Sequence, residues 1–152
     1  MGCMCRKMLG KCQDGKFDYA DMVLSAHCNR VNVVDGHTEC VSVKFKKADV
    51  SAADVVAALQ SFTSPAQELK LPSAPPRPIV VLEEENRPQP RLDRDMDRGF
   101  TVTVGRVRQC PIFDVKFTLC SHNTVIGAAG GAILNAELAV AKGYLPSPQA
   151  AK

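Results

Sequence analysis

Tryptophan is absent from the 152-residue sequence, and aromatic residues make up only 5% of it. Proteins that bind single-stranded nucleic acid commonly stack the bases on aromatic side chains, so a platform of that kind is not expected here. The net charge is only +3, and the basic residues are spread along the chain. The sequence therefore predicts neither a nucleic-acid partner nor an anionic membrane surface as a partner.

Long apolar segments are missing as well. No run approaches the roughly 18 apolar residues that a membrane-spanning helix requires, and the N-terminal MGCMCRKMLGKC lacks the pattern of a secretory leader. The sequence contains seven cysteines, an odd number. Without a leader, we expect these cysteines to be free thiols in a reducing compartment, the cytoplasm.

Four regions follow one another along the chain. Residues 1–12 are interpreted as the remnant of an upstream helix with an atypical start, because CRKMLG is rich in helix formers, no capping residue precedes it and Gly10 can end the helix. Residues 13–121 form the main domain, residues 122–145 a C-terminal helix and residues 146–152 a tail. A hydrophobic content of 45% is enough for one packed domain of this length.

Alternation of apolar and polar residues with period two predicts strands. It is clearest in TECVSVKFK, where Val41, Val43 and Phe45 alternate with polar or small residues. The other predicted strands are DMVLSAH, IVVLE, FTVTVGRVR and IFDVKFTLC. The charged segment EEENRPQPRLDRDMDRG is interpreted as a solvated loop, with a binding arm as the alternative.

Two segments are predicted to be helices. SAADVVAALQSF starts with Ser51 and Asp54 at the spacing of a capping box and carries its apolar residues on one face. The last helix extends from about Thr124 to Lys142, with Asn123 or Thr124 as its cap. These elements predict an α+β domain with a mixed or antiparallel sheet and helices packed on one face. The other face needs a cover, so we expect a partner domain or subunit.

Two histidines and two cysteines lie within fourteen residues of SAHCNRVNVVDGHTECVSVKF. His27, Cys28, His37 and Cys40 are of the types that ligate zinc. However, adjacent side chains on a strand point to opposite faces, so His27 and Cys28 would not both reach one ion. We therefore predict no metal site. A small zinc protein remains a third hypothesis for the whole chain, resting on this cluster alone.

Catalysis is another interpretation of this segment. Cys28 or Cys40 could pair with a histidine as a nucleophile, although free cysteines are more often small buried hydrophobes. Arg30 offers a planar fork for a carboxylate, and His37 titrates in the range that acid–base catalysis needs. By spacing alone, a salt-bridged arginine and a structural histidine are the commoner alternatives.

A glycine-rich segment, SHNTVIGAAGGAILNAE, opens the last predicted helix. Gly127, Gly130 and Gly131 would let another backbone or a cofactor approach closely. The spacing fits neither the Walker loop nor the dinucleotide fingerprint G-x-G-x-x-G. From the residues alone, tight helix packing is the favoured interpretation.

Several of these segments resemble one enzyme family in the same order. CNRVNVVDGHTECVSVKF closely resembles the RVPV-x-DGHT-x-CV segment of aspartate-semialdehyde dehydrogenases of the archaeal and fungal branch. RPQPRLDRDMDRGFTVTVGRVR is similar to that family's RPQPRLDR…G…V-VGR segment, SHNTVIGAAGGAILNAELAVAKGYL to its C-terminal helix, and CRKMLG to its ETRKILG. The match extends from about Cys5 to Leu145.

The resemblance implies an enzyme with a Rossmann NADP domain and a second, catalytic and dimerisation domain. This chain matches the later part of that second domain and the helix that returns to the NADP domain. The implied reaction reduces β-aspartyl phosphate, a small-molecule substrate, to aspartate semialdehyde with NADPH, on the route to lysine, threonine and methionine. The implied assembly is a homodimer or homotetramer.

The resemblance also assigns roles to residues. It implies that His37 moves protons, that Arg30 binds the substrate carboxylate, and that Asn123 and Gly127 contact the nicotinamide end of NADP. The two cysteines near His37 are then packing residues.

The chain also departs from the family pattern. It contains neither the S-N-C-x-T-like nucleophile segment nor the NADP fingerprint, and Asn32 stands where the family has proline. Met4 and Cys5 replace the family's Glu and Thr. We therefore expect the isolated chain to be inactive, with a non-catalytic dimerisation protein that pairs with itself or with an intact subunit as the alternative.

Overall fold

The structure, a computed structural model, describes residues 2–146, and these form two compact units that divide between Asn32 and Val33. The first unit contains helix α1 (Gly2–Met8) and the antiparallel strands β1 (Lys11–Gln13) and β2 (Lys16–Asp18). A two-residue turn joins the strands, with positive φ at both Asp14 (49°) and Gly15 (73°). This backbone twist matches that of two antiparallel strands, so the hairpin closes in two residues.

The segment that follows β2 shows that one predicted strand is wrong. Residues 21–27, DMVLSAH, form no strand, and all of them are exposed. A strand requires a neighbour that completes its hydrogen-bond ladder, and among the described residues this segment pairs with none. The segment has the composition of a strand, but no neighbouring strand pairs with it among the described residues.

The second unit is built on a four-stranded sheet in the order β3-β6-β5-β4. Its strands are β3 (His37–Val43), β4 (Ile79–Leu82), β5 (Val102–Gln109) and β6 (Val115–Ser121). Strands β4 and β5 are parallel, whereas the other two pairs are antiparallel. The predicted α+β class with a mixed sheet is confirmed.

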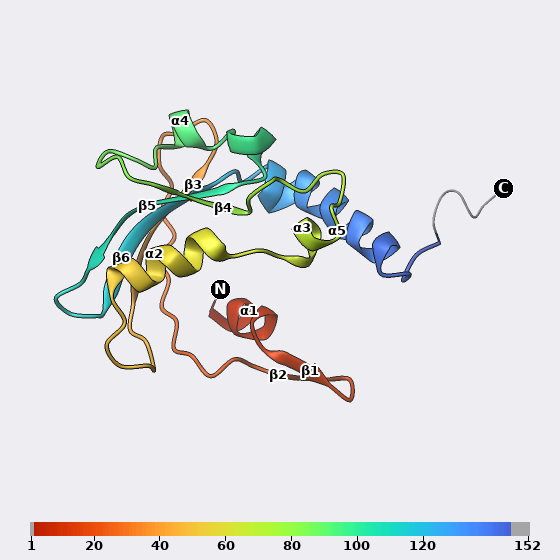
Figure 1. Ribbon diagram of the computed structural model, residues 1–152, viewed down its shortest axis with the longest axis horizontal. Coiled ribbons are helices and arrows are strands. Elements are labelled where there is room, and N and C mark those ends of the chain that lie inside the picture. Colours follow the sequence, from red (N-terminus) through yellow and green to blue (C-terminus); the bar gives the residue numbers. More distant parts are fainter. Residues whose placement is uncertain (1, 147–152) are drawn as a thin grey trace. The chain divides into compact units, whose positions relative to one another are not determined.

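Helices lie over one face of this sheet and around one end of it (Figure 1). They are α2 (Ala52–Ser61), α3 (Pro65–Glu68), α4 (Pro90–Asp93), the 3₁₀ turn η1 (Met96–Gly99), the π-helical η2 (Val125–Ala129) and α5 (Gly130–Ala141). The predicted capping box of α2 is confirmed: the Ser51 hydroxyl accepts the Asp54 N–H at 3.1 Å, and the Ser51 N–H donates to the Asp54 carboxylate at 2.9 Å. Helix α2 packs against β4 and β5. No helix in the described residues is long and apolar enough to cross a membrane.

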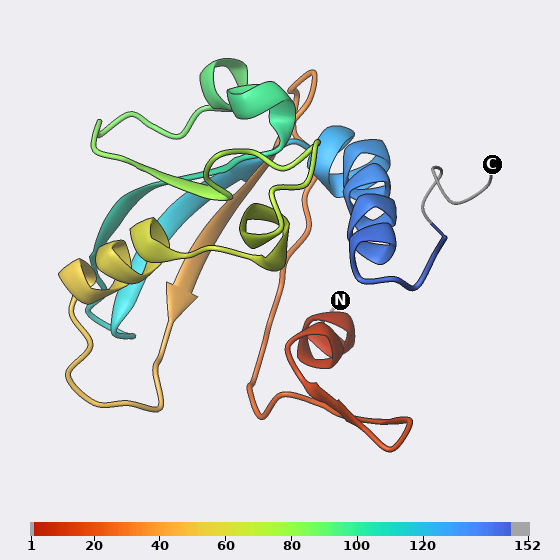
Figure 2. The same cartoon turned by 45° about the vertical axis from the view of Figure 1, so that its right-hand side comes forward.

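The C-terminal helix follows β6 at one end of the sheet (Figure 2). It occupies the predicted range but is interrupted at Ala128, whose φ and ψ are −147° and −108°. Neither Asn123 nor Thr124 caps it with a side-chain hydrogen bond, so that prediction is wrong. A Cβ on Gly130 would lie 2.8 Å from the Phe100 ring, which supports the packing interpretation of that glycine.

Side chains are buried on both faces at the centre of the sheet. Val104 and Val115 are almost fully buried. Thr103 and Cys120, which face each other in the β5–β6 register, are buried on the opposite face. Polar groups are therefore enclosed near the end of β6, where the predicted site residues also lie.

Candidate functional site

His37 opens β3 at one end of the sheet. Its Cα pairs with that of Ser121 in β6, and the residue is exposed. Gly36 precedes it with a φ of +108°, and a Cβ at this position would lie 3.0 Å from the Pro90 Cβ. Only glycine combines this backbone conformation with such close packing against α4. The backbone on both sides of His37 is thus held, while its imidazole stays accessible.

Asn123 reaches this turn from the other end of the sequence. Its side-chain Oδ1 accepts the Gly36 N–H at 2.8 Å, across 87 positions. Gly127 follows in η2, where its N–H donates to the His122 carbonyl at 3.1 Å. The structure therefore places His37, Asn123 and Gly127, three of the predicted site residues, in elements that meet at this end of the sheet.

Arg30, the predicted carboxylate ligand, lies in the first unit. It is exposed and belongs to the irregular segment that follows β2. The assignment of Arg30 as a substrate ligand stays a prediction.

The prediction that the two cysteines near His37 are packing residues is wrong. Cys28 and Cys40 are both exposed, whereas Cys120 is the buried cysteine of the chain's described part. Cys40 lies on β3, an edge strand of the sheet, which explains its exposure. Within the described part of the chain, no group of three or more metal-ligating side chains is placed to share an ion.

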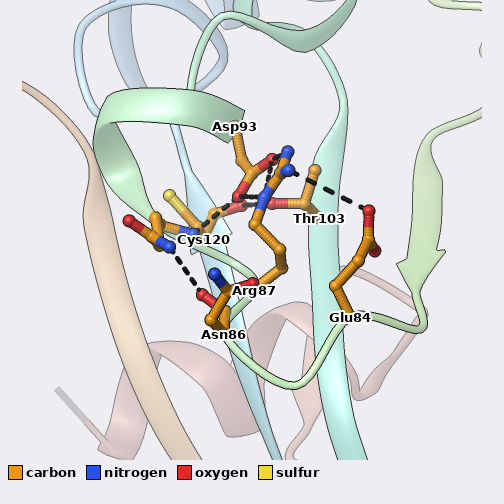
Figure 3. A network of polar contacts seen from close by, with 7 residues as sticks. Glu84, Asn86, Arg87, Asp93, Thr103 and Cys120 are labelled. Atoms are coloured by element: carbon orange, nitrogen blue, oxygen red, sulfur yellow. Dashed lines mark hydrogen bonds and ion pairs between the residues drawn. The ribbon is translucent and has the colours of Figure 1, made fainter.

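A buried ion pair lies next to this site, in a segment that the sequence was predicted to leave solvated (Figure 3). Asp93 in α4 is fully buried and accepts hydrogen bonds from the Arg87 guanidinium, with Nε at 2.9–3.0 Å, and from the Gln89 N–H at 2.6 Å. The solvated-loop interpretation is therefore wrong for these residues. Charge alone suggested a loop, because a carboxylate is rarely buried unless it is paired.

The surroundings of the pair shift the pKa of Asp93 itself and of the neighbouring Cys120. Burial alone would raise the pKa of Asp93, but the hydrogen bonds from Arg87 and from the Gln89 backbone outweigh it, and the pKa lies below its ordinary value. Burial raises the pKa of the Cys120 thiol, and the negative charge of Asp93 raises it further. Asp93 is therefore ionised and Cys120 is a neutral thiol at neutral pH, which gives Cys120 no character of a nucleophile.

His122 is a further buried polar residue that the sequence did not single out. Its side chain is 8% exposed, and its Nε2 lies 3.4 Å from the Asp95 carboxylate. The motif SHNT offered one signal, a histidine directly before the predicted cofactor contact. Its burial, however, depends on the packing of η1 and η2 and is not readable from local sequence.

Comparison with known proteins covers most of the chain. A protein-family model described as "Semialdehyde dehydrogenase, dimerisation domain" matches residues 2–126. The aspartate-semialdehyde dehydrogenase of Aspergillus fumigatus is 52% identical over 128 residues, which cover 82% of this chain and 35% of that protein. The protein of the same name from Archaeoglobus fulgidus is 48% identical over 134 residues, which cover 88% of this chain and 38% of that protein.

A solved structure extends the likeness to three dimensions. The crystal structure of aspartate semialdehyde dehydrogenase with NADP from Candida albicans superposes with a TM-score of 0.86 at 42% identity. The match covers 95% of this chain and 42% of that one. The family resemblance predicted from four sequence motifs is confirmed. The chain spans less than half the length of these relatives.

Proposed function

The chain belongs to the semialdehyde dehydrogenase family through its dimerisation domain, and from this we propose that it forms the His37-bearing catalytic and dimerisation part of an NADP-dependent aspartate-semialdehyde dehydrogenase. The observation that carries the proposal is the contact between the Gly36 turn and Asn123 at 2.8 Å. It joins the turn before the proposed acid–base residue to the proposed cofactor segment. Both segments lie in a chain that is 52% identical to an enzyme of that name.

His37 suits the transfer of a proton. Its ring is exposed, and its backbone is held by the ladder with Ser121 on one side and by Gly36 on the other. A histidine with a free ring and a fixed backbone can donate to or accept from a substrate group near neutral pH. We propose that Arg30 binds the substrate carboxylate through its two parallel N–H groups. The acyl group itself would be taken by a cysteine outside the segments found in this sequence.

The cofactor segment also fits its proposed role. A Cβ on Gly127 would meet only the His122 carbonyl oxygen, at 3.3 Å, so the outer side of this exposed residue is open to a ligand. Asn123 uses its Oδ1 for Gly36, which leaves its amide N–H groups as donors toward a carboxamide such as that of nicotinamide. NADP would supply or accept the hydride when bound. Asn123 and Gly127 would orient its reactive end beside His37.

The experiment that tests the function assays the protein that contains this chain. We expect phosphate-dependent reduction of NADP with aspartate semialdehyde, the reverse of the biosynthetic direction. His37→Ala should lower kcat by roughly 10²-fold or more. His27→Ala is the matched control, because His27 is also an exposed histidine and has no proposed role in the reaction. Full activity of the His37 variant would remove the acid–base assignment.

Two further parts of the proposal have their own tests. The 152-residue chain alone should show no turnover, because acyl transfer requires nucleophile, base and substrate ligand together. Arg30→Lys should raise KM more than it lowers kcat, since lysine lacks the planar fork. The cytoplasmic location remains a prediction from the cysteine content.

Dimerisation without catalysis is the second candidate function. The family model that covers residues 2–126 is described as a dimerisation domain, which favours an interaction role. Light scattering of the purified chain should show a homodimer or a complex with an intact subunit. A folded monomer that binds neither would contradict this candidate.

A further inference from the structure

Both ring nitrogens of His122 lie close to polar groups. The Thr124 N–H donates to its Nδ1 at 3.3 Å, and the Thr124 hydroxyl lies 3.2 Å from the same atom. A ring nitrogen that accepts a backbone N–H carries no proton of its own, so the neutral ring bears its proton on Nε2. Nε2 is the atom that lies 3.4 Å from the Asp95 carboxylate. Both ring nitrogens therefore face a polar group.

The ring is also enclosed by two irregular elements. In η1, Asp97, Arg98 and Gly99 all have positive φ, at 47°, 62° and 82°. A Cβ on Gly99 would lie 3.0 Å from the His122 Cδ2 and 3.0 Å from the Val125 Cβ at the start of η2. Non-glycine residues in this region of φ are strained, and such strain persists where the surrounding packing holds it. The imidazole is part of that packing.

His122 holds the residues that follow it in two ways. Its ring accepts the Thr124 N–H, and its carbonyl accepts the Gly127 N–H at 3.1 Å. Asn123 lies between these two anchor points, and its side chain holds the Gly36 N–H. Asn123 therefore links the segment that His122 anchors to the turn that precedes His37.

We propose that His122 is a positioning residue: its buried imidazole fixes the 122–127 segment so that Asn123 holds the Gly36–His37 turn. The importance of this turn rests on the proposed function, in which His37 moves protons. His122 itself touches neither the Gly36 turn nor the ring of His37 in the contacts described above. Its effect passes through Asn123 and Gly36.

The test follows the hydrogen exchange of single amides by NMR in the full 152-residue chain. We expect His122→Ala to accelerate exchange of the Gly36 amide by about tenfold or more, because its acceptor on Asn123 becomes mobile. Amides of the β5–β6 ladder, such as that of Val104, should keep their rates. Asn123→Ala removes the acceptor itself and should accelerate Gly36 to the same extent, with no further increase in the double variant.

A conservative variant separates positioning from general stability. Asn at position 122 keeps a hydrogen-bond acceptor close to the place of Nδ1, so His122→Asn should restore Gly36 exchange to within about threefold of the wild-type rate. Equal acceleration of the Gly36 and ladder amides in His122→Ala would overturn the proposal, as would an unchanged Gly36 rate. If His122→Ala does not fold, Asp95→Ala removes the group facing Nε2 and should still accelerate Gly36 about threefold; an unchanged rate there overturns the proposal.

Kinetics in the protein that contains the chain keep this inference distinct from the proposed function. His122→Ala should lower kcat with little change in KM, and His122→Asn should recover most of kcat. If His37→Ala leaves turnover intact, the proposed function fails while the exchange result for Gly36 stands. If His37 is essential and His122→Ala changes neither kcat nor Gly36 exchange, only the positioning role fails.

Discussion

Replacing Arg87 with methionine should reverse the pH dependence of stability that Asp93 contributes. Asp93 has no exposed surface, and its carboxylate is held by the Arg87 guanidinium and the Gln89 N–H. Methionine fills similar space but donates no hydrogen bond. The Arg87→Met variant therefore leaves a buried carboxylate with one backbone partner in place of an ion pair.

The size of the effect follows from the burial of Asp93. Leaving one charge of a buried pair without its partner costs about 3–5 kcal/mol, and we expect the lower end at Asp93, because the Gln89 N–H remains. For a chain of this length, 3 kcal/mol corresponds to a decrease in Tm of roughly 6–12 °C. Arg91, an exposed arginine in α4, provides the matched control, and Arg91→Met should change stability by less than about 0.5 kcal/mol.

The sign of the pH effect differs between the two proteins. In the wild type, the pKa of Asp93 is lowered, so its contribution is complete above the ordinary carboxyl pKa of about 3.9 and is lost as the pH falls through the lower folded value. In Arg87→Met, burial is no longer outweighed and the pKa of Asp93 rises. Its folded state then binds the proton more tightly, and the stability deficit shrinks as the pH falls from neutral toward the ordinary carboxyl pKa.

Urea unfolding at several pH values measures the stability deficit of Arg87→Met. Far-UV circular dichroism is the signal, because the chain has no tryptophan for fluorescence. Arg87→Met/Asp93→Leu should be more stable than Arg87→Met, because it removes the unpaired charge as well. A deficit below about 1 kcal/mol at pH 7, or one that stays constant down to pH 4, would refute the reasoning.

Three further predictions concern other parts of the chain. Gly36→Ala should lower the free energy of unfolding by more than about 1 kcal/mol in a urea titration, because its φ of +108° disfavours a side chain. Ser51→Ala should cost about 1 kcal/mol in the same assay, since it removes the cap of α2. Hydrogen bonds from the backbone N–H groups of Phe113 and its neighbour lower the pKa of Cys110, whereas burial raises that of Cys120. Iodoacetamide followed by mass spectrometry should therefore modify Cys110 before Cys120, and earlier reaction at Cys120 would contradict this.

Regular elements of the second unit were predictable from local sequence. The capping box of Ser51 and Asp54 lies within four residues, and the alternation in β5 and β6 follows directly from the two faces of a sheet. The segment DMVLSAH shows the limit of this reasoning. Its composition suits a strand, but a strand forms only where a neighbouring strand completes its backbone hydrogen bonds.

The polar interior was not predictable in the same way. Arg87 and Asp93 are separated by six positions in a charged segment, and only folding against the sheet turns them into a buried pair. The bond between Gly36 and Asn123 spans 87 positions, so no local pattern contains it. Family resemblance suggested the proposed roles of His37 and Asn123, whereas the contact that connects their segments came from the structure alone.

The turnover of aspartate semialdehyde by the native protein tests the central claim most directly. The protein that carries this chain can be captured from its source through the C-terminal segment AELAVAKGYLPSPQAAK, and NADP reduction is then followed with and without phosphate. The proposed function predicts turnover that requires both NADP and phosphate and that falls by roughly 10²-fold or more in His37→Ala. A captured protein without this activity, or one whose His37→Ala variant is as active as the wild type, would contradict it.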